Sequence, residues 1–183
     1  MTKRGFTLIE IMTAVSVFAV VTTISMGSIL TVFDVNRKSE SIKTVMDNLN
    51  LSLESMAREM RFGTNYVCSP PSQFGSIPSP AICPAGGISV AFLDNLSAMV
   101  IYRKSGSTIE KSRDGGLNYI TVTAPEITIN DLQFYVFGAL KEAGGSQRQP
   151  KVIIKIKGTA GTKQGTQTDF TVQTMVSQRQ LDL

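Results

Sequence analysis

Histidine and tryptophan are absent from this 183-residue sequence, and cysteine occurs only twice. Without histidine, the chain lacks the most frequent general base of nucleophilic catalysis and a principal zinc ligand. No serine lies in a G-x-S-x-G sequence, and Gly86-Gly87 and Gly144-Gly145 lack the lysine of a phosphate-binding loop. We therefore expect neither an enzyme nor a bound cofactor.

Charge is missing from one long stretch, which runs from Ile11 to Phe33. As a helix this stretch would be about 35 Å long, enough to cross the hydrocarbon core of a bilayer. Lys3 and Arg4 precede it, so the positive-inside rule predicts a cytoplasmic N-terminus and an exported remainder. The stretch also contains Gly27 and several hydroxyl residues, which either suit packing against other helices or bond to their own backbone.

The remaining charges favour no particular ligand. The formal charge is +4, from 18 basic and 14 acidic residues, and the basic residues are scattered without interleaved aromatics. We therefore expect no nucleic-acid partner. Asp94, Asp114 and Asp131 lie at predicted turns or strand ends, where they either cap backbone groups or contribute to a calcium site. Because no EF-hand spacing is present, we expect no metal site.

The run Lys3-Arg4-Gly5-Phe6-Thr7-Leu8-Ile9-Glu10 resembles the processing site of type IV prepilins and type II secretion pseudopilins. A short basic leader, a glycine, a phenylalanine, an acid four residues later and an apolar helix follow in the family's order. By this resemblance, a prepilin peptidase cleaves between Gly5 and Phe6 and methylates the new amine of Phe6. The resemblance also implies that Glu10 pairs with that amine on a neighbouring subunit. Such pairing would offset the roughly 2.5–3.5 kcal/mol that an acid costs inside a membrane.

The resemblance further implies a filament subunit of a type IV pilus or a type II secretion system. Its partners would be other pilin or pseudopilin subunits, the prepilin peptidase, an inner-membrane assembly platform and the lipid bilayer. It would cross the cytoplasmic membrane once and then enter a pilus or a periplasmic pseudopilus. Residues 53–61 and 173–179 are similar to J-type pseudopilins and related minor pilins, which favours a minor subunit. The alternative is a membrane-tethered exported binding or adhesin domain that enters no filament.

Periodicity predicts an α+β fold. After Phe33, apolar residues recur every three or four positions, which is the pattern of one helical stripe: Ile42, Met46, Leu49, Leu53, Met56 and Met60. One helix is therefore expected from about residue 6 to residue 62, with Gly63 ending it. From Ile88 the period changes to two, which predicts a mainly antiparallel sheet that the stripe covers.

The expected segments are a leader (1–5), a transmembrane half-helix (6–33), an amphipathic half-helix (34–62), a proline-rich loop (63–87) and a β-rich exported head (88–183). Cys68 and Cys83 bracket most of that loop, on the predicted exported side. An oxidising compartment favours a disulfide between them, worth about 3 kcal/mol by loop entropy. A metal site or a reactive thiol is the alternative, which the absence of histidine disfavours.

Overall fold

A computed structural model describes residues 5–68, 79–140, 149–161 and 167–179. These residues form one long helix, α1 (Leu8–Arg61), followed by nine strands. The chain divides into two compact units, residues 1–41 and 42–183. The boundary falls within α1, so the first unit is the apolar part of the helix. The second unit, called the head below, contains the end of α1 and all of the strands.

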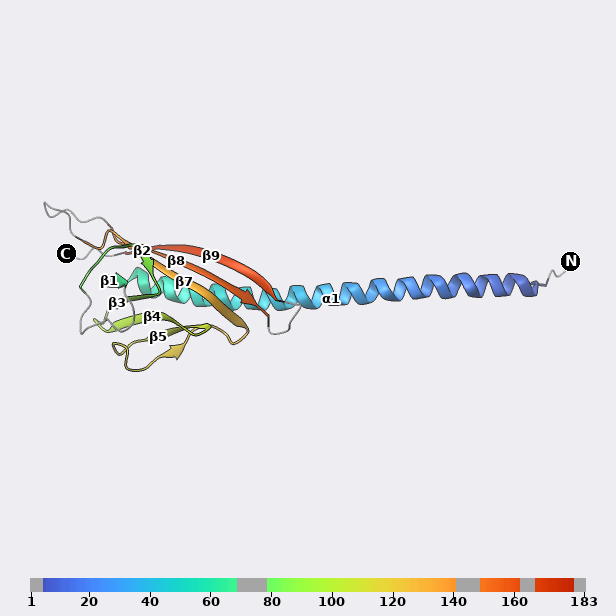
Figure 1. Cartoon of the computed structure of the whole chain (residues 1–183), viewed down its shortest axis with the longest axis horizontal. Helices are drawn as coiled ribbons and strands as arrows, with labels where there is room; N and C mark the ends of the chain where they lie inside the picture. The colour runs from blue at the N-terminus through green and yellow to red at the C-terminus, as the bar shows by residue number, and fades with distance from the viewer. Residues whose placement is uncertain (1–4, 69–78, 141–148, 162–166, 180–183) are drawn as a thin grey trace. The chain divides into compact units, whose positions relative to one another are not determined.

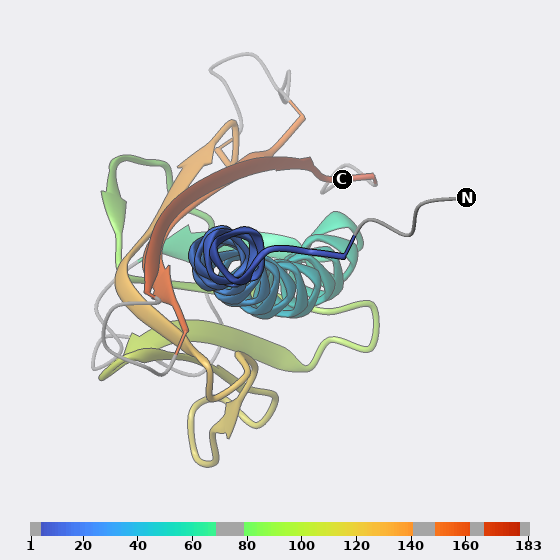
Figure 2. The ribbon, with the colours of Figure 1, turned by 90° about the vertical axis from the view of Figure 1, so that its right-hand side faces the viewer.

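The strands of the head form two antiparallel sheets (Figure 1). The five-stranded sheet has the order β1-β3-β4-β5-β6, and its strands are β1 (Thr64–Cys68), β3 (Ser89–Leu93), β4 (Met99–Ser105), β5 (Thr108–Ser112) and β6 (Ile120–Thr121). The four-stranded sheet has the order β2-β7-β8-β9, and its strands are β2 (Cys83–Gly87), β7 (Ile127–Phe137), β8 (Lys151–Ala160) and β9 (Thr168–Ser177). In Figure 2 the orange and red strands curve around one side of the teal part of α1.

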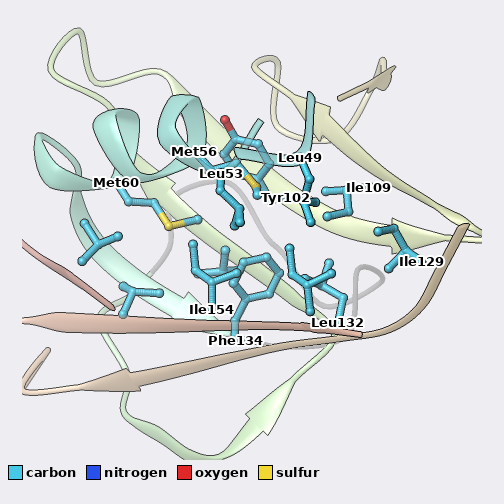
Figure 3. Packing of buried hydrophobic residues seen from close by; sticks show 14 of the residues in the cluster. Leu49, Leu53, Met56, Met60, Tyr102, Ile109, Ile129, Leu132, Phe134 and Ile154 are labelled. Carbon is cyan, nitrogen blue, oxygen red and sulfur yellow. The ribbon is translucent and has the colours of Figure 1, made fainter. Parts of the chain in front are cut away.

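The core lies where the amphipathic end of α1 meets both sheets. Leu49, Leu53, Met56 and Met60 are at most 6% exposed, and they pack against apolar residues of the two sheets (Figure 3). The sheet residues in this cluster include Phe92, Tyr102, Ile109, Leu132, Phe134 and Ile154. The buried stripe confirms the helical periodicity, with one shift: Val45 is buried, whereas the predicted Ile42 and Met46 are half-buried.

The end of α1 is closed by contacts from distant parts of the head. The backbone N–H of Arg179 donates to the carbonyl of Arg61 at 2.8 Å, which satisfies one of the orphan carbonyls of the last turn. The hydroxyl of Tyr66 donates to the carbonyls of Met60 and Gly63. A Cβ on Gly63 would lie 2.4 Å from the ring of Phe92, so close packing requires glycine there. The predicted helix end at Gly63 is thus only two residues from the observed one.

The structure corrects the sequence prediction in two places. The segment 63–87 was predicted as a loop, yet strands β1 and β2 lie at its two ends, while residues 69–78 fall outside the described part. Pro84 is tolerated in β2 because that strand is at the edge of its sheet, where one row of N–H groups has no partner strand. The single predicted sheet is divided into two, although the α+β class and the antiparallel pairing are as predicted.

Candidate functional site

The N-terminal segment presents the predicted processing residues on an exposed end of the chain. Lys3 and Arg4 lie outside the described residues. Gly5 and Phe6 precede α1 and belong to no helix or strand, and the side chain of Phe6 is 82% exposed. The peptide bond between them therefore lies outside the helix.

Thr7 and Glu10 close the start of α1 with a reciprocal pair of side-chain bonds. The N–H and the hydroxyl of Thr7 donate to Oε2 of Glu10 at 3.1 and 3.0 Å, and the N–H of Glu10 donates to the Thr7 hydroxyl at 3.4 Å. This arrangement is a capping box, in which a threonine at the N-cap and a glutamate three residues later satisfy orphan N–H groups of the helix. Its signature, T-x-x-E, is visible in the sequence, but the sequence analysis assigned no role to Thr7.

The first unit is an uninterrupted apolar helix surface. Its large apolar side chains from Phe6 to Val35 are all at least 52% exposed in the single chain. Its hydroxyl groups donate to carbonyls of the preceding turn, at distances of 2.7–3.2 Å. Of the two roles considered for them, bonding to their own backbone is therefore observed in the isolated chain. The surface that remains suits a lipid or another apolar helix.

α1 is also the helix, within the described part of the chain, that is long and apolar enough to cross a membrane. Its most apolar window has a mean hydropathy of 2.0 and no residue of that window is buried in the protein. Together with the predicted processing residues at its start, this helix is consistent with a membrane-anchored, exported protein.

The disulfide connects the two sheets. Cys68 ends β1, at an edge of the five-stranded sheet, and Cys83 begins β2, at an edge of the four-stranded sheet. Their Cα atoms are 6.1 Å apart and their sequence separation is 15. The bridge therefore holds two edge strands together at the place where the sheets adjoin.

A cluster of polar side chains surrounds Glu59, on the face of α1 that meets the five-stranded sheet. The hydroxyl of Tyr102 donates to its carboxylate at 2.7 Å, the guanidinium of Arg113 donates at 3.0 Å, and the ammonium of Lys111 also donates to it. Burial alone would raise the pKa of Glu59, but these hydrogen bonds and the charges of Lys111 and Arg113 outweigh it, so the pKa is lowered. Burial and the bond to Glu59 raise the pKa of Tyr102.

Of the three aspartates expected at turns or strand ends, Asp94 and Asp114 cap backbone groups, whereas Asp131 lies within strand β7. Oδ1 of Asp94 accepts bonds from the N–H groups of Leu96 and Ala98, each at 2.9 Å. Asp114 accepts bonds from the Asn118 backbone, the Ser112 hydroxyl and the Asn118 side chain, and these bonds lower its pKa. Within the described ranges, no group of three histidine, cysteine or acidic side chains is placed to hold a metal ion.

Comparison with known proteins identifies the N-terminal segment. The model of the prokaryotic N-terminal methylation motif matches residues 1–26. The chain thus carries the prepilin-type cleavage and methylation motif, which includes Gly5, Phe6 and Glu10. Neither a curated protein nor a solved structure matches this chain. The motif points to a subunit of the type IV pilin and pseudopilin class, a structural rather than a catalytic role, which implies processing by a prepilin peptidase and assembly with other pilin subunits.

Proposed function

We propose that this chain is a minor pilin or minor pseudopilin, a subunit of a type IV pilus or a type II secretion filament. The observation that carries the proposal is the methylation motif at residues 1–26, which includes the start of a helix whose apolar side chains are exposed from Phe6 to Val35. A prepilin peptidase removes residues 1–5 and methylates the amine of Phe6. The helix then leaves the lipid and packs among the helices of neighbouring subunits, guided by the assembly platform of the inner membrane.

Glu10 is the residue that directs this packing. An uncompensated acid inside the bilayer costs roughly 2.5–3.5 kcal/mol. In the single chain its carboxylate is held by Thr7, and both donors of Thr7 reach the same oxygen, Oε2. The second oxygen, Oε1, can therefore accept the methylated amine of Phe6 from a neighbouring subunit without loss of the cap. A positive charge at this position adds an ion pair in an environment of low dielectric constant, where such pairs are strong.

The mass and the N-terminus of the mature protein test the processing step. Protein isolated from its own cell envelope should begin at N-methylated Phe6. Replacing Gly5 with leucine should leave the chain beginning at Met1, because the residue before the cut no longer fits the peptidase. A native protein that retains Met1 would contradict the proposal.

The assembly step is tested by Glu10→Gln, with Glu54→Gln as the matched control. Both changes remove a carboxylate from the same helix, but Glu54 is 68% exposed and pairs with Arg58 one turn away. Glu10→Gln should leave the melting temperature of the head unchanged and sharply lower the amount of protein in sheared filaments or pseudopili. Glu54→Gln should assemble as the wild type does. If Glu10→Gln assembles as the wild type does, the proposed role of Glu10 is contradicted. If neither chain enters filaments, the membrane-tethered binding domain becomes the better explanation.

A further inference from the structure

Each sheet of the head has two edges, and three of these four edges are poorly suited to pairing with another strand. β6 contains only two residues. β1 contains a register shift between Thr64 and Val67, and Asn65 has a φ of 56°. β2 contains Pro84, which has no N–H, and Gly86 has a φ of 82°. Short, bulged or proline-containing strands are the means by which proteins protect sheet edges from unwanted pairing.

The fourth edge, β9, lacks all of these protections. Its ten residues pair with β8 in an unbroken register from Thr168 to Ser177. The strand contains no proline, glycine, lysine or arginine, and Asp169 is its one charge. In the described part of the head, no strand pairs with its other side. β9 therefore presents a regular row of backbone donors and acceptors, which is a template for an added strand.

The core-facing side chains of the four-stranded sheet are also less buried at this edge than in the middle of the sheet. On the core side of β8, Val152, Ile154 and Ile156 are at most 2% exposed. On the core side of β9, Val172 and Thr174 are only half-buried, although Phe170 and Val176 at the ends are buried. A further strand with apolar residues at alternate positions would lie beside this middle part and place apolar side chains next to Val172 and Thr174. The sheet thus has both hydrogen-bonding groups and apolar surface available at the same edge.

We propose that the free edge of β9 binds an extended segment of a different protein chain, which adds a fifth strand to the β2-β7-β8-β9 sheet. The segment alternates apolar residues, which extend the core face beyond Val172 and Thr174, with polar residues beside Thr171, Gln173 and Met175. Main-chain hydrogen bonds supply the affinity in this mode of recognition, and the alternate side chains supply the specificity.

A second copy of this chain fits the edge poorly. The end of β9 lies beside the end of α1, because Arg179 bonds to Arg61, and Figure 1 shows β9 following the helix in the same direction. Antiparallel pairing of β9 with β9 of another copy would place the points where α1 enters the two heads at opposite ends. Subunits that enter one filament from the same membrane, as the proposed function requires, are not related by such a two-fold axis. β2 of another copy offers no regular edge, because of Pro84 and its register shift.

Site-specific photo-crosslinking in the native cell envelope tests this proposal with the full chain. A benzophenone amino acid is placed at Thr171 on β9 or, as the control, at Leu117, which is 83% exposed in a loop of the head. We expect a covalent adduct at Thr171 whose cross-linked peptide comes from another exported protein and alternates apolar and polar residues. Leu117 should give no adduct with that protein.

Two proline variants show whether the adduct depends on the free edge. Successive N–H groups of a strand point to opposite sides, so one of Gln173→Pro and Thr174→Pro removes a bond to β8 and the other removes only a donor of the free edge. The melting temperature tells them apart, because the second change is better tolerated. That better-tolerated variant should lower the yield of the Thr171 adduct about fivefold or more, the factor expected for one backbone hydrogen bond and the loss of strand fit.

The results of the cross-linking experiment can be distinguished from those of the filament-assembly test. The proposal is overturned by the absence of an adduct at Thr171, by an adduct formed only with copies of this chain, or by a yield that the better-tolerated proline leaves unchanged. The proposed role of Glu10 is tested separately, because Glu10→Gln changes neither β9 nor the head. An adduct that survives in that variant would support the edge contact even if the filament proposal failed.

Discussion

Replacing Glu59 with glutamine should destabilise the head by about 2–3 kcal/mol. The side chain of Glu59 is 20% exposed and that of its partner Lys111 is 12% exposed, so water screens this ion pair only partly. In Glu59→Gln the Lys111 ammonium stays enclosed without its counter-charge, and the bonds from Tyr102 and Arg113 lose their charged acceptor. A hydrogen bond to a charged group contributes roughly 1.5–3 kcal/mol, and loss of one partner of a fully buried pair costs about 3–5 kcal/mol. Partial exposure places this site between those figures.

The loss should depend on pH in a defined direction. Because the folded-state pKa of Glu59 is lowered, its ionised form stabilises the head above the unfolded pKa of about 4.3, and this contribution is lost as pH falls through the folded value. The wild type and Glu59→Gln should therefore differ most at neutral pH and converge in acid. For a domain of this size, the difference at pH 7 corresponds to a melting temperature lower by about 6–12 °C.

Thermal unfolding of the detergent-solubilised full chain, followed by circular dichroism at several pH values, measures this effect. Glu54→Gln is the control, because it removes an exposed ion pair on the same helix and should cost less than about 0.5 kcal/mol. The reasoning is refuted if the two variants unfold at the same temperature at pH 7. It is also refuted if the deficit of Glu59→Gln persists undiminished near pH 2.5.

Two further changes probe the way the head is held together. Replacing both Cys68 and Cys83 with serine should lower the free energy of unfolding by about 3 kcal/mol, because the bridge closes a loop with a sequence separation of 15; a loss below about 0.5 kcal/mol in urea titration would contradict this. Gly63→Ala should cost about 1–3 kcal/mol by overpacking, since the new Cβ would lie 2.4 Å from the ring of Phe92. An unchanged melting temperature in Gly63→Ala would show that Phe92 can move aside freely.

Local periodicity predicted the parts of this fold that depend on neighbours in sequence. The stripe from Leu49 to Met60 required only the spacing of apolar residues along one helix, and the same positions are buried in the structure. The prepilin-type motif was equally visible, because it is a continuous run at the N-terminus, and the family model matches it over residues 1–26. The cap by Thr7 could have been predicted, since T-x-x-E is a local signature of a helix start. It was missed because the same residues had been interpreted as part of the processing site.

The division into two sheets could not be predicted in this way, because strand pairing is decided by contacts between distant segments. β1 and β3 pair across 20 or more intervening positions, and β2 pairs with β7 rather than with its neighbour β3. Nothing local in Cys83–Gly87 distinguishes an edge strand from a proline-rich loop. The ion pairs of Glu59 with Lys111 and Arg113 are likewise made by residues 52 and 54 positions away along the chain.

The same reasoning explains why the open edge of β9 is informative. An edge strand that binds nothing on its outer side does not need a regular outer edge. The outer edges of β1, β2 and β6 are interrupted by a bulge, by a proline and by short length, respectively. β9 keeps ten regular positions, and Asp169 is the only charge along it that opposes pairing with another strand. Such an edge is a liability for a protein that works alone. It is an advantage for a protein whose head binds another chain, as we propose for the free edge of β9.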